Sequence, residues 1–208
     1  MSVRDFVHGR YVHSRRVRVL SRRLARLLPA GATVLDVGSG DGWLASLIVQ
    51  ERPDVRVQGL DVLVRPKTHV PVAAFDGSRI PYADRSVDVV LLVDVLHHTV
   101  DPRVLLAEAA RVARQCVLVK DHLCESRFDH WLLRGMDRVG NARHGVVLPF
   151  QYWPAARWRQ ALAELALTPA VWETDLRIYP AWADWLFGRS RQVIMRLEVG
   201  GVPACQGN

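Results

Sequence analysis

A glycine-rich turn follows the first strongly apolar run of the chain. In the stretch "VLDVGSGDG", residues 34–42, glycine stands at every second position after Val37. Glycine permits the unusual backbone angles of a tight turn and lets the backbone come close to a ligand. A helix expected after the turn adds free N–H groups at the same place. Because the spacing G-x-G-x-G differs from the dinucleotide fingerprint G-x-G-x-x-G, the turn predicts a ligand site of another kind.

Aspartates stand at the ends of three successive predicted strands. Asp36 lies two residues before the first glycine, where it would repel a pyrophosphate and attract a cationic amino group. Asp61 is placed to accept hydrogen bonds from ribose hydroxyls, and Asp76, followed by Gly77, suits an adenine amino group. A single aspartate could simply cap a helix or a turn. Three of them at the ligand-binding edge of a parallel sheet favour a binding site.

The stretch "KDHLCESRFDH", residues 120–130, has the residue types of a metal site. His122 and Cys124 are only two positions apart and do not share a helix face. On a regular helix, His122 and His130 would be offset by about 80°, which is poor geometry for one ion. We therefore predict no metal site in this stretch. Asp121 and His122 remain as candidate cleft residues at the end of a strand.

Short apolar strands alternate with helices, which is typical of a parallel, doubly wound α/β sheet covered on both faces. The strands are expected at 32–37, 55–61, 70–76, 86–94, 115–121, 171–178 and 191–199. The helices are expected at 10–28, 42–52, 101–114, 121–138 and 154–167. In the fourth helix, Asp121, Glu125 and Asp129 would form one polar stripe. The last two strands have no full crossover helix between them, so an antiparallel edge is expected.

The composition indicates one soluble globular domain. The net charge is +7, and only Lys67 and Lys120 among the 28 basic residues are lysines. The arginines near the N-terminus alternate with a helical apolar pattern, which favours a solvated helix face over a nucleic-acid contact. No apolar run reaches the roughly 18–20 residues of a membrane span. Three cysteines without a C-x-x-C pattern suit a reducing compartment, so we expect a cytoplasmic location.

These motifs resemble the class I S-adenosylmethionine-dependent methyltransferases, in particular the branch with the ubiquinone and menaquinone C-methyltransferases and many small-molecule enzymes. The match runs through "VLDVGSGDG", "GLDV" and "IPYADRSVDVVLLVDVLHH". The resemblance implies S-adenosylmethionine as cofactor and a seven-stranded sheet in the order 3-2-1-4-5-7-6, with strand seven antiparallel. The cofactor residues that it implies are Asp36, Gly38, Ser39 and Gly40 for the methionine part, Asp61 and Val62 for the ribose, Asp76 and Gly77 for the adenine, and Asp94 at the methyl-donor cleft.

Methyl transfer from a sulfonium is an in-line displacement, in which the protein mainly aligns the nucleophile, the methyl carbon and the leaving sulfur. Some oxygen or carbon nucleophiles also need a base to take their proton, and whether this reaction uses one is left open. The candidate catalytic residues are His97, Asp121, His122 and His144. His97 is expected to line the cleft, with a base role open. His144 lies in the loop "NARHGV" and is explained equally well as a turn residue.

Two other segments are expected to border the site within one domain over residues 1–208. The resemblance implies that residues 1–28 form a helical lid, in which Tyr11 and His13 take part. Residues 121–167 are expected to form a helical and loop insertion on the substrate side. Three of its aromatic residues, Phe150, Tyr152 and Trp153, would either wall an apolar acceptor or pack as core.

The leading hypothesis is methylation of a small-molecule acceptor. The charge of +7 keeps nucleic-acid methylation as an alternative, but the position after the fourth strand reads "DVLHH" instead of the Asn/Asp-Pro-Pro-aromatic motif of base amino-group methylation. A domain that binds the donor without turnover is a third possibility. The glycine spacing and Asp36 disfavour a nicotinamide oxidoreductase, whose fold is related. We expect a small-molecule partner in preference to nucleic acid, and no metal, and the oligomeric state is left open.

Overall fold

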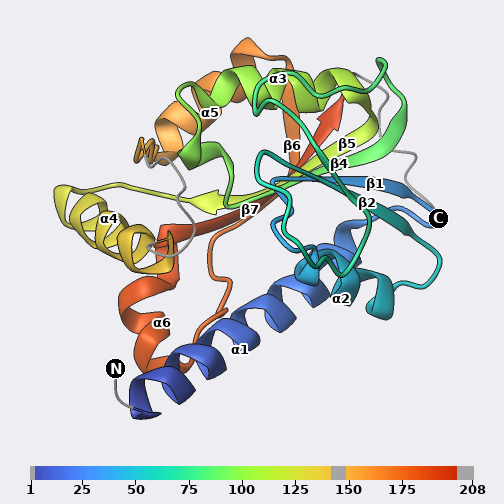
Figure 1. The fold of residues 1–208 in the computed structure, drawn as a ribbon. Coiled ribbons are helices and arrows are strands. Elements are labelled where there is room, and N and C mark those ends of the chain that lie inside the picture. The colour runs from blue at the N-terminus through green and yellow to red at the C-terminus, as the bar shows by residue number, and fades with distance from the viewer. Residues whose placement is uncertain (1–2, 142–148, 201–208) are drawn as a thin grey trace, which may run out of the picture.

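A mixed seven-stranded sheet forms the centre of the computed structural model, which describes residues 3–141 and 149–200 (Figure 1). Its strands are β1 (Thr33–Val37), β2 (Arg56–Asp61), β3 (Val72–Ala74), β4 (Val87–Val93), β5 (Ala113–His122), β6 (Leu167–Glu173) and β7 (Gln192–Val199). They lie in the order β3-β2-β1-β4-β5-β7-β6, and β7 runs antiparallel to both β5 and β6. The predicted α/β class, strand order and antiparallel strand seven are confirmed.

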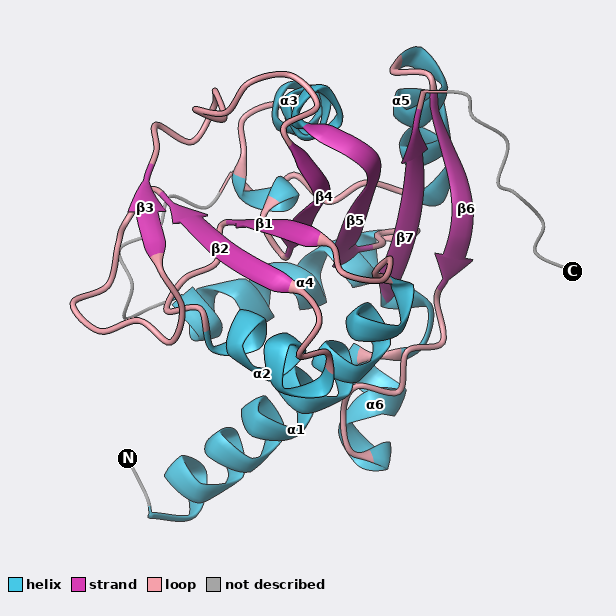
Figure 2. Cartoon of the chain, turned by 90° about the vertical axis from the view of Figure 1, so that its right-hand side faces the viewer, coloured by secondary structure: helices cyan, strands magenta, loops and turns pink. Residues whose placement is uncertain are grey.

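Helices cover both faces of the sheet (Figure 2). They are α1 (Val3–Leu27), α2 (Trp43–Glu51), α3 (Pro102–Val112), α4 (Arg127–Asn141), α5 (Ala155–Glu164) and α6 (Ala181–Phe187), with a 3-10 turn η1 (Leu96–His98) after β4. Side chains of α3 and α5 pack in the core on one face. Side chains of α1, α2 and α6 pack in the core on the other face, so each face has its own hydrophobic core.

Helix α1 is held by burial on one side and by ion pairs on the other. Val17, Leu20 and Leu24 are buried at helical spacing, and the two leucines pack in the core on this face of the sheet. Arg22 pairs with Glu51 at 3.2 Å, and Arg23 pairs with Glu173 at 2.9 Å. These two arginines of the basic helix therefore contact acidic groups of the same chain.

The helix predicted at 121–138 is wrong in its first turns. Strand β5 continues through His122, because its pairing with β7 extends to Gln192. Helix α4 begins at Arg127, where the Ser126 hydroxyl accepts a hydrogen bond from the Asp129 N–H at 3.1 Å. The polar stripe of Asp121, Glu125 and Asp129 therefore does not exist. Asp129 is instead buried in a 2.5 Å ion pair with Arg191.

The strand predicted at 171–178 is also misplaced. Strand β6 begins four residues earlier, at Leu167, and ends at Glu173. Leu176 and Ile178 are buried in the following loop rather than in the sheet, which explains the misleading apolar signal. The short helix α6 stands between the last two strands, where the sequence suggested little structure.

Among the described residues, none of the helices is both long enough and apolar enough to cross a membrane. Cys116 and Cys124 are free thiols. The cytoplasmic location stays a prediction.

Candidate active site

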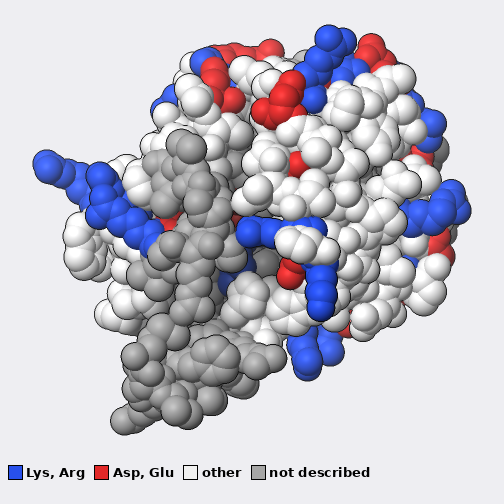
Figure 3. All heavy atoms as spheres, viewed as in Figure 1, with Lys and Arg blue, Asp and Glu red and all other residues white. Residues whose placement is uncertain are grey.

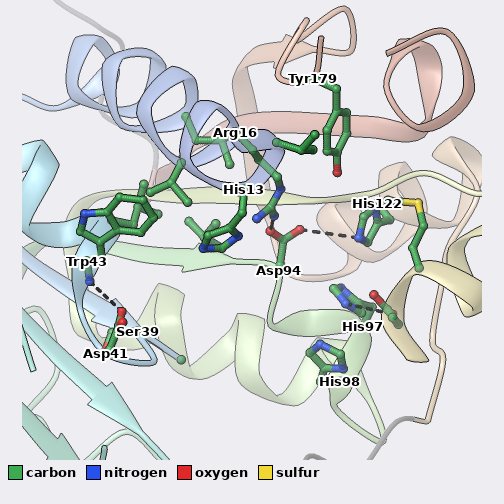
Figure 4. A pocket seen from close by; sticks show the side chains of 18 of the residues that line it. His13, Arg16, Ser39, Asp41, Trp43, Asp94, His97, His98, His122 and Tyr179 are labelled. Carbon is green, nitrogen blue, oxygen red and sulfur yellow. Dashed lines mark hydrogen bonds and ion pairs between the residues drawn. The ribbon is translucent and has the colours of Figure 1, made fainter. Parts of the chain in front are cut away.

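A cavity of about 620 Å³ lies at the carboxyl ends of β1, β4 and β5, between these strand ends and helices α1 and α6 (Figure 4). It is lined by Val12, His13, Arg16, Val17, Leu20, Asp36, Gly38, Ser39, Asp41, Trp43, Leu44, Val93, Asp94, His97, His98, His122, Met136, Asp137, Tyr179 and Trp182. This is the edge where open α/β sheets bind their ligands. The glycine-rich turn and the polar residues after β4 and β5 therefore share one cavity.

The glycine-rich turn requires glycine at its first position. Gly38 has a φ of +77°, and a Cβ there would lie 2.3 Å from the side chain of Val95. The N–H groups of Gly38 and Ser39 donate to the Leu60 carbonyl at 2.7 and 3.0 Å. The Asp61 carboxylate accepts the Gly40 N–H at 2.7 Å. The end of β2 thus fixes the turn that follows β1.

Asp36 is a buried carboxyl group on the wall of the cavity. Burial and the nearby charge of Asp61 raise its pKa to about 7. A cationic partner would favour ionisation of this buried carboxyl group, because a nearby positive charge stabilises the carboxylate. The position therefore suits an ammonium group of a ligand.

The residues predicted for the ribose and the adenine lie outside this cavity. Asp61 supports the turn and also accepts the Leu63 N–H at 2.8 Å. One carboxylate oxygen of Asp76 accepts three hydrogen bonds from Ser78 and Arg79, so this aspartate does cap a turn. Their roles towards a ligand, like those of Val62 and Gly77, stay predictions.

An ion-pair network surrounds Asp94, the first residue after β4. The ammonium group of the fully buried Lys120 lies 2.5 Å from one Asp94 oxygen, and the Arg16 guanidinium of α1 contacts the other. Burial disfavours the charge of Asp94, but Arg16 and Lys120 outweigh this effect and hold its pKa far below its ordinary value. Figure 4 shows Arg16 reaching from α1 to Asp94 across the cavity.

His97 sits between two carboxylates below this network. Its Nδ1 lies 2.6 Å from Asp121 Oδ1, and its Nε2 lies 3.4 Å from Asp137 Oδ2. The ring is buried, which disfavours an imidazolium, yet the carboxylates of Asp121 and Asp137 raise the pKa of His97. Asp137 in turn accepts a hydrogen bond from the Tyr152 hydroxyl.

The neighbouring histidines are neutral near pH 7. Burial and the charge of His97 lower the pKa of His98 to about 4. Burial, Lys120 and His97 lower the pKa of His122 well below its ordinary value. The Gln192 amide nitrogen lies 3.0 Å from His122 Nδ1 and 3.2 Å from the Phe187 carbonyl. Since the amide donates to both, His122 carries its proton on Nε2, which faces Asp94 at 3.7 Å.

Six of the residues predicted from the sequence meet in the cavity: Asp36, Gly38, Ser39, Asp94, His97 and His122. Asp121 is buried directly behind His97. His144 lies outside the described residues. The sequence reasoning missed Arg16, Lys120, Asp137 and Tyr179. Lys120 carried a usable signal, because a lysine inside the apolar run "VLVKDH" must find a buried partner.

The segments expected to border the site are placed as follows. The His13 ring of α1 packs on Trp43 at 5.6 Å between ring centres, beside the glycine-rich turn. The side chain of Tyr11 lies outside the described part. Tyr152 and Trp153 are buried, which agrees with core packing for these two, whereas Phe150 is half-buried beneath Arg134. The lid and insertion roles stay predictions.

The strand order and the glycine-rich turn at the sheet edge define the fold of the class I S-adenosylmethionine-dependent methyltransferases. The chain belongs to the methyltransferase domain family, whose model matches residues 11–170. It is an S-adenosylmethionine-dependent methyltransferase, with S-adenosylmethionine as its cofactor.

Known relatives agree with this assignment. An uncharacterized methyltransferase of Mycobacterium sp. (strain KMS) is 37% identical over 178 residues, which cover 76% of this chain and 69% of the relative. The 27-O-demethylrifamycin SV methyltransferase of Amycolatopsis mediterranei (strain S699) is 33% identical over 110 residues, 46% of this chain and 40% of that protein. The structure of a SAM-dependent methyltransferase from Aquifex aeolicus aligns over 86% of this chain and 89% of its own, with 17% identity and a TM-score of 0.57.

Proposed function

We propose that this methyltransferase acts on a small-molecule acceptor. One observation carries the proposal. The glycine-rich turn, Asp94, His97 and His122 line the same cavity of about 620 Å³, and residues of α1 and α6 complete its lining. Small-molecule sites are clefts of about 300–1,000 Å³ with a few placed polar groups. The name of the rifamycin relative, which describes a small-molecule acceptor, is in keeping with this.

In this proposal the turn at residues 38–42, with Asp36 and Asp61, holds the donor, and we call it the donor side. The acceptor side consists of Asp94, His97, Asp121 and His122, with His144 as a further candidate. An acceptor hydroxyl gives its proton to solvent, and its oxygen forms a bond to the methyl carbon of the donor. The carbon–sulfur bond breaks, and its electron pair stays on sulfur, so that S-adenosylhomocysteine leaves.

Nucleic-acid methylation has less support. Among the described residues, Figure 3 shows basic side chains scattered among acidic ones on the face it views. Several arginines are also paired within the chain, as for Arg22 and Arg23. Nucleic-acid sites usually cluster basic residues on one surface.

The test is to follow a labelled methyl group from the donor. The protein is incubated with methyl-labelled S-adenosylmethionine in separate reactions. These contain a panel of hydroxylated small molecules, RNA, DNA or a cell extract. We expect label in the low-mass fraction, and none with Asp61→Ala. Label in nucleic acid would refute the acceptor class, and donor binding without any transfer would favour a non-catalytic domain.

A further inference from the structure

Two groups of potential metal ligands share His97 in the cavity. One group is Asp94, His97 and His122, and the other is His97, His98 and Asp137. In each group, one ligand atom per residue lies within 4.8 Å of the others. The residues come from the end of β4, η1, β5 and α4, so no local spacing predicts them. Each group can be compared with what a metal ion requires.

The first group is a poor metal site. Both oxygens of Asp94 already contact cations, Lys120 and Arg16. The amide of Gln192 keeps the proton of His122 on Nε2, the nitrogen that would have to bind the ion. A divalent cation here would face two positive side chains and a protonated ring nitrogen.

The second group has the arrangement of a metal site around His97. Asp121 Oδ1 lies 2.6 Å from His97 Nδ1, so this nitrogen donates to a carboxylate. The ion takes the place of the proton that the carboxylates favour on Nε2, and Nδ1 keeps its carboxylate partner, as in many metal-bound histidines. The 3.4 Å between His97 Nε2 and Asp137 Oδ2 exceeds a good hydrogen bond. It matches the separation of about 3.4 Å between tetrahedral ligands whose bonds to the ion are about 2.1 Å.

The remaining members of the second group fit the same assignment. The Nδ1 of His98 is buried and has no hydrogen-bond partner in the described part of the chain. The His98 ring lies 4.0 Å from the His97 ring, centre to centre. The Tyr152 hydroxyl donates to Asp137, as second hydrogen-bond partners of ligating carboxylates do.

We propose that His97, His98 and Asp137 bind one divalent transition-metal ion, with Asp121 and Tyr152 as positioning residues. Two imidazoles and one carboxylate suit ions such as Zn²⁺, Fe²⁺ or Co²⁺, and three protein ligands leave a position open. All three ligands line the cavity, so the open position is available to an acceptor oxygen. The prediction of no metal was based on the spacing in residues 120–130 and on the reaction, which does not require a metal, whereas this set of ligands comes from other elements.

A bound ion would make the proposed function more specific. The expected acceptors would then be hydroxyl compounds that bind the metal through oxygen. A bound cation lowers the pKa of a coordinated hydroxyl, whose proton passes to solvent before the oxygen attacks the methyl carbon. This role rests on the proposed function, but the binding of the ion does not.

The test is a Co²⁺ titration of the untagged full chain followed by visible absorption, with Zn²⁺ calorimetry beside it. We expect one ion per chain and Co²⁺ d–d bands. His98→Ala and Asp137→Asn should abolish these bands, and Asp121→Asn should weaken Zn²⁺ binding about 10–100-fold. His69→Ala removes an exposed histidine outside the cavity and should bind as the wild type does.

Three results would overturn the metal site. The first is the absence of stoichiometric binding by the wild type, and the second is equal binding by the wild type and His98→Ala. The third is an intense thiolate band, because the ion would then be on a cysteine such as Cys124. Circular dichroism confirms that each variant is folded. Donor binding is measured separately, so a failed metal site and a failed methyltransferase proposal give different results.

Discussion

The donor side of the cavity is built from backbone, whereas the acceptor side is built from buried charged side chains. On the donor side, a turn with positive φ at Gly38 is fixed by backbone hydrogen bonds and by Asp61. On the acceptor side, Asp94 and Lys120 form a pair inside the protein, and His97 lies between two carboxylates. The proposed donor side therefore depends on local backbone geometry, while the proposed acceptor side depends on charge balance between distant elements.

The largest expected effect is on the donor side, for Asp61→Ala. If the carboxylate accepts the ribose hydroxyls, its removal costs two hydrogen bonds to a charged group, each worth about 1.5–3 kcal/mol, so affinity falls roughly 100-fold or more. Calorimetry with S-adenosylhomocysteine measures this change. Asp175→Ala, an exposed aspartate paired with Arg177, is the matched control and should bind normally. Unchanged affinity in Asp61→Ala would disprove the ribose assignment.

The next effect is on the acceptor side and concerns stability. Lys120→Met removes the buried partner of Asp94 and should lower the free energy of unfolding by about 3 kcal/mol, since breaking a buried pair is costly. The other lysine, Lys67, is exposed, and Lys67→Met should change stability by less than about 0.5 kcal/mol. Urea unfolding of both variants measures the difference. Equal stability would mean that desolvation of Lys120 cancels its attraction to Asp94.

The two sides also differ in how far the sequence predicts them. The proposed donor side lies within short stretches, so glycine spacing and strand-end aspartates were enough to propose Asp36, Gly38 and Asp61. The acceptor side joins Arg16, Lys120 and others from distant elements. No local sequence pattern predicts that these residues contact one another. The wrong start of the helix predicted at 121–138 has the same origin. Pairing with β7, a distant strand, extends β5 through His122, so the chain is still in the sheet where a helix was predicted.

A smaller effect is expected from Gly38→Ala. The φ of +77° and the 2.3 Å approach of a Cβ to Val95 would strain the turn by about 1–3 kcal/mol, which corresponds to roughly 10–100-fold weaker donor binding. Gly31→Ala is a matched control, because Gly31 has a φ of +65° but nothing within 4 Å of a Cβ. It should lose stability without losing donor affinity. Equal donor affinities in the two variants would show that strain at the turn does not reach the ligand.

The smallest effect is the pH dependence of donor binding through Asp36. Without a ligand its pKa is raised to about 7, so at lower pH a proton must leave before the carboxylate can pair with the donor ammonium. Affinity should therefore rise by up to about tenfold per pH unit towards pH 7 and then level off. Calorimetry between pH 5.5 and 7 keeps the donor amino group protonated, since its pKa is about 7.7–8.0. Asp36→Asn cannot ionise and should show a flat profile. A flat profile in the wild type would place the ammonium elsewhere and remove Asp36 from the donor side.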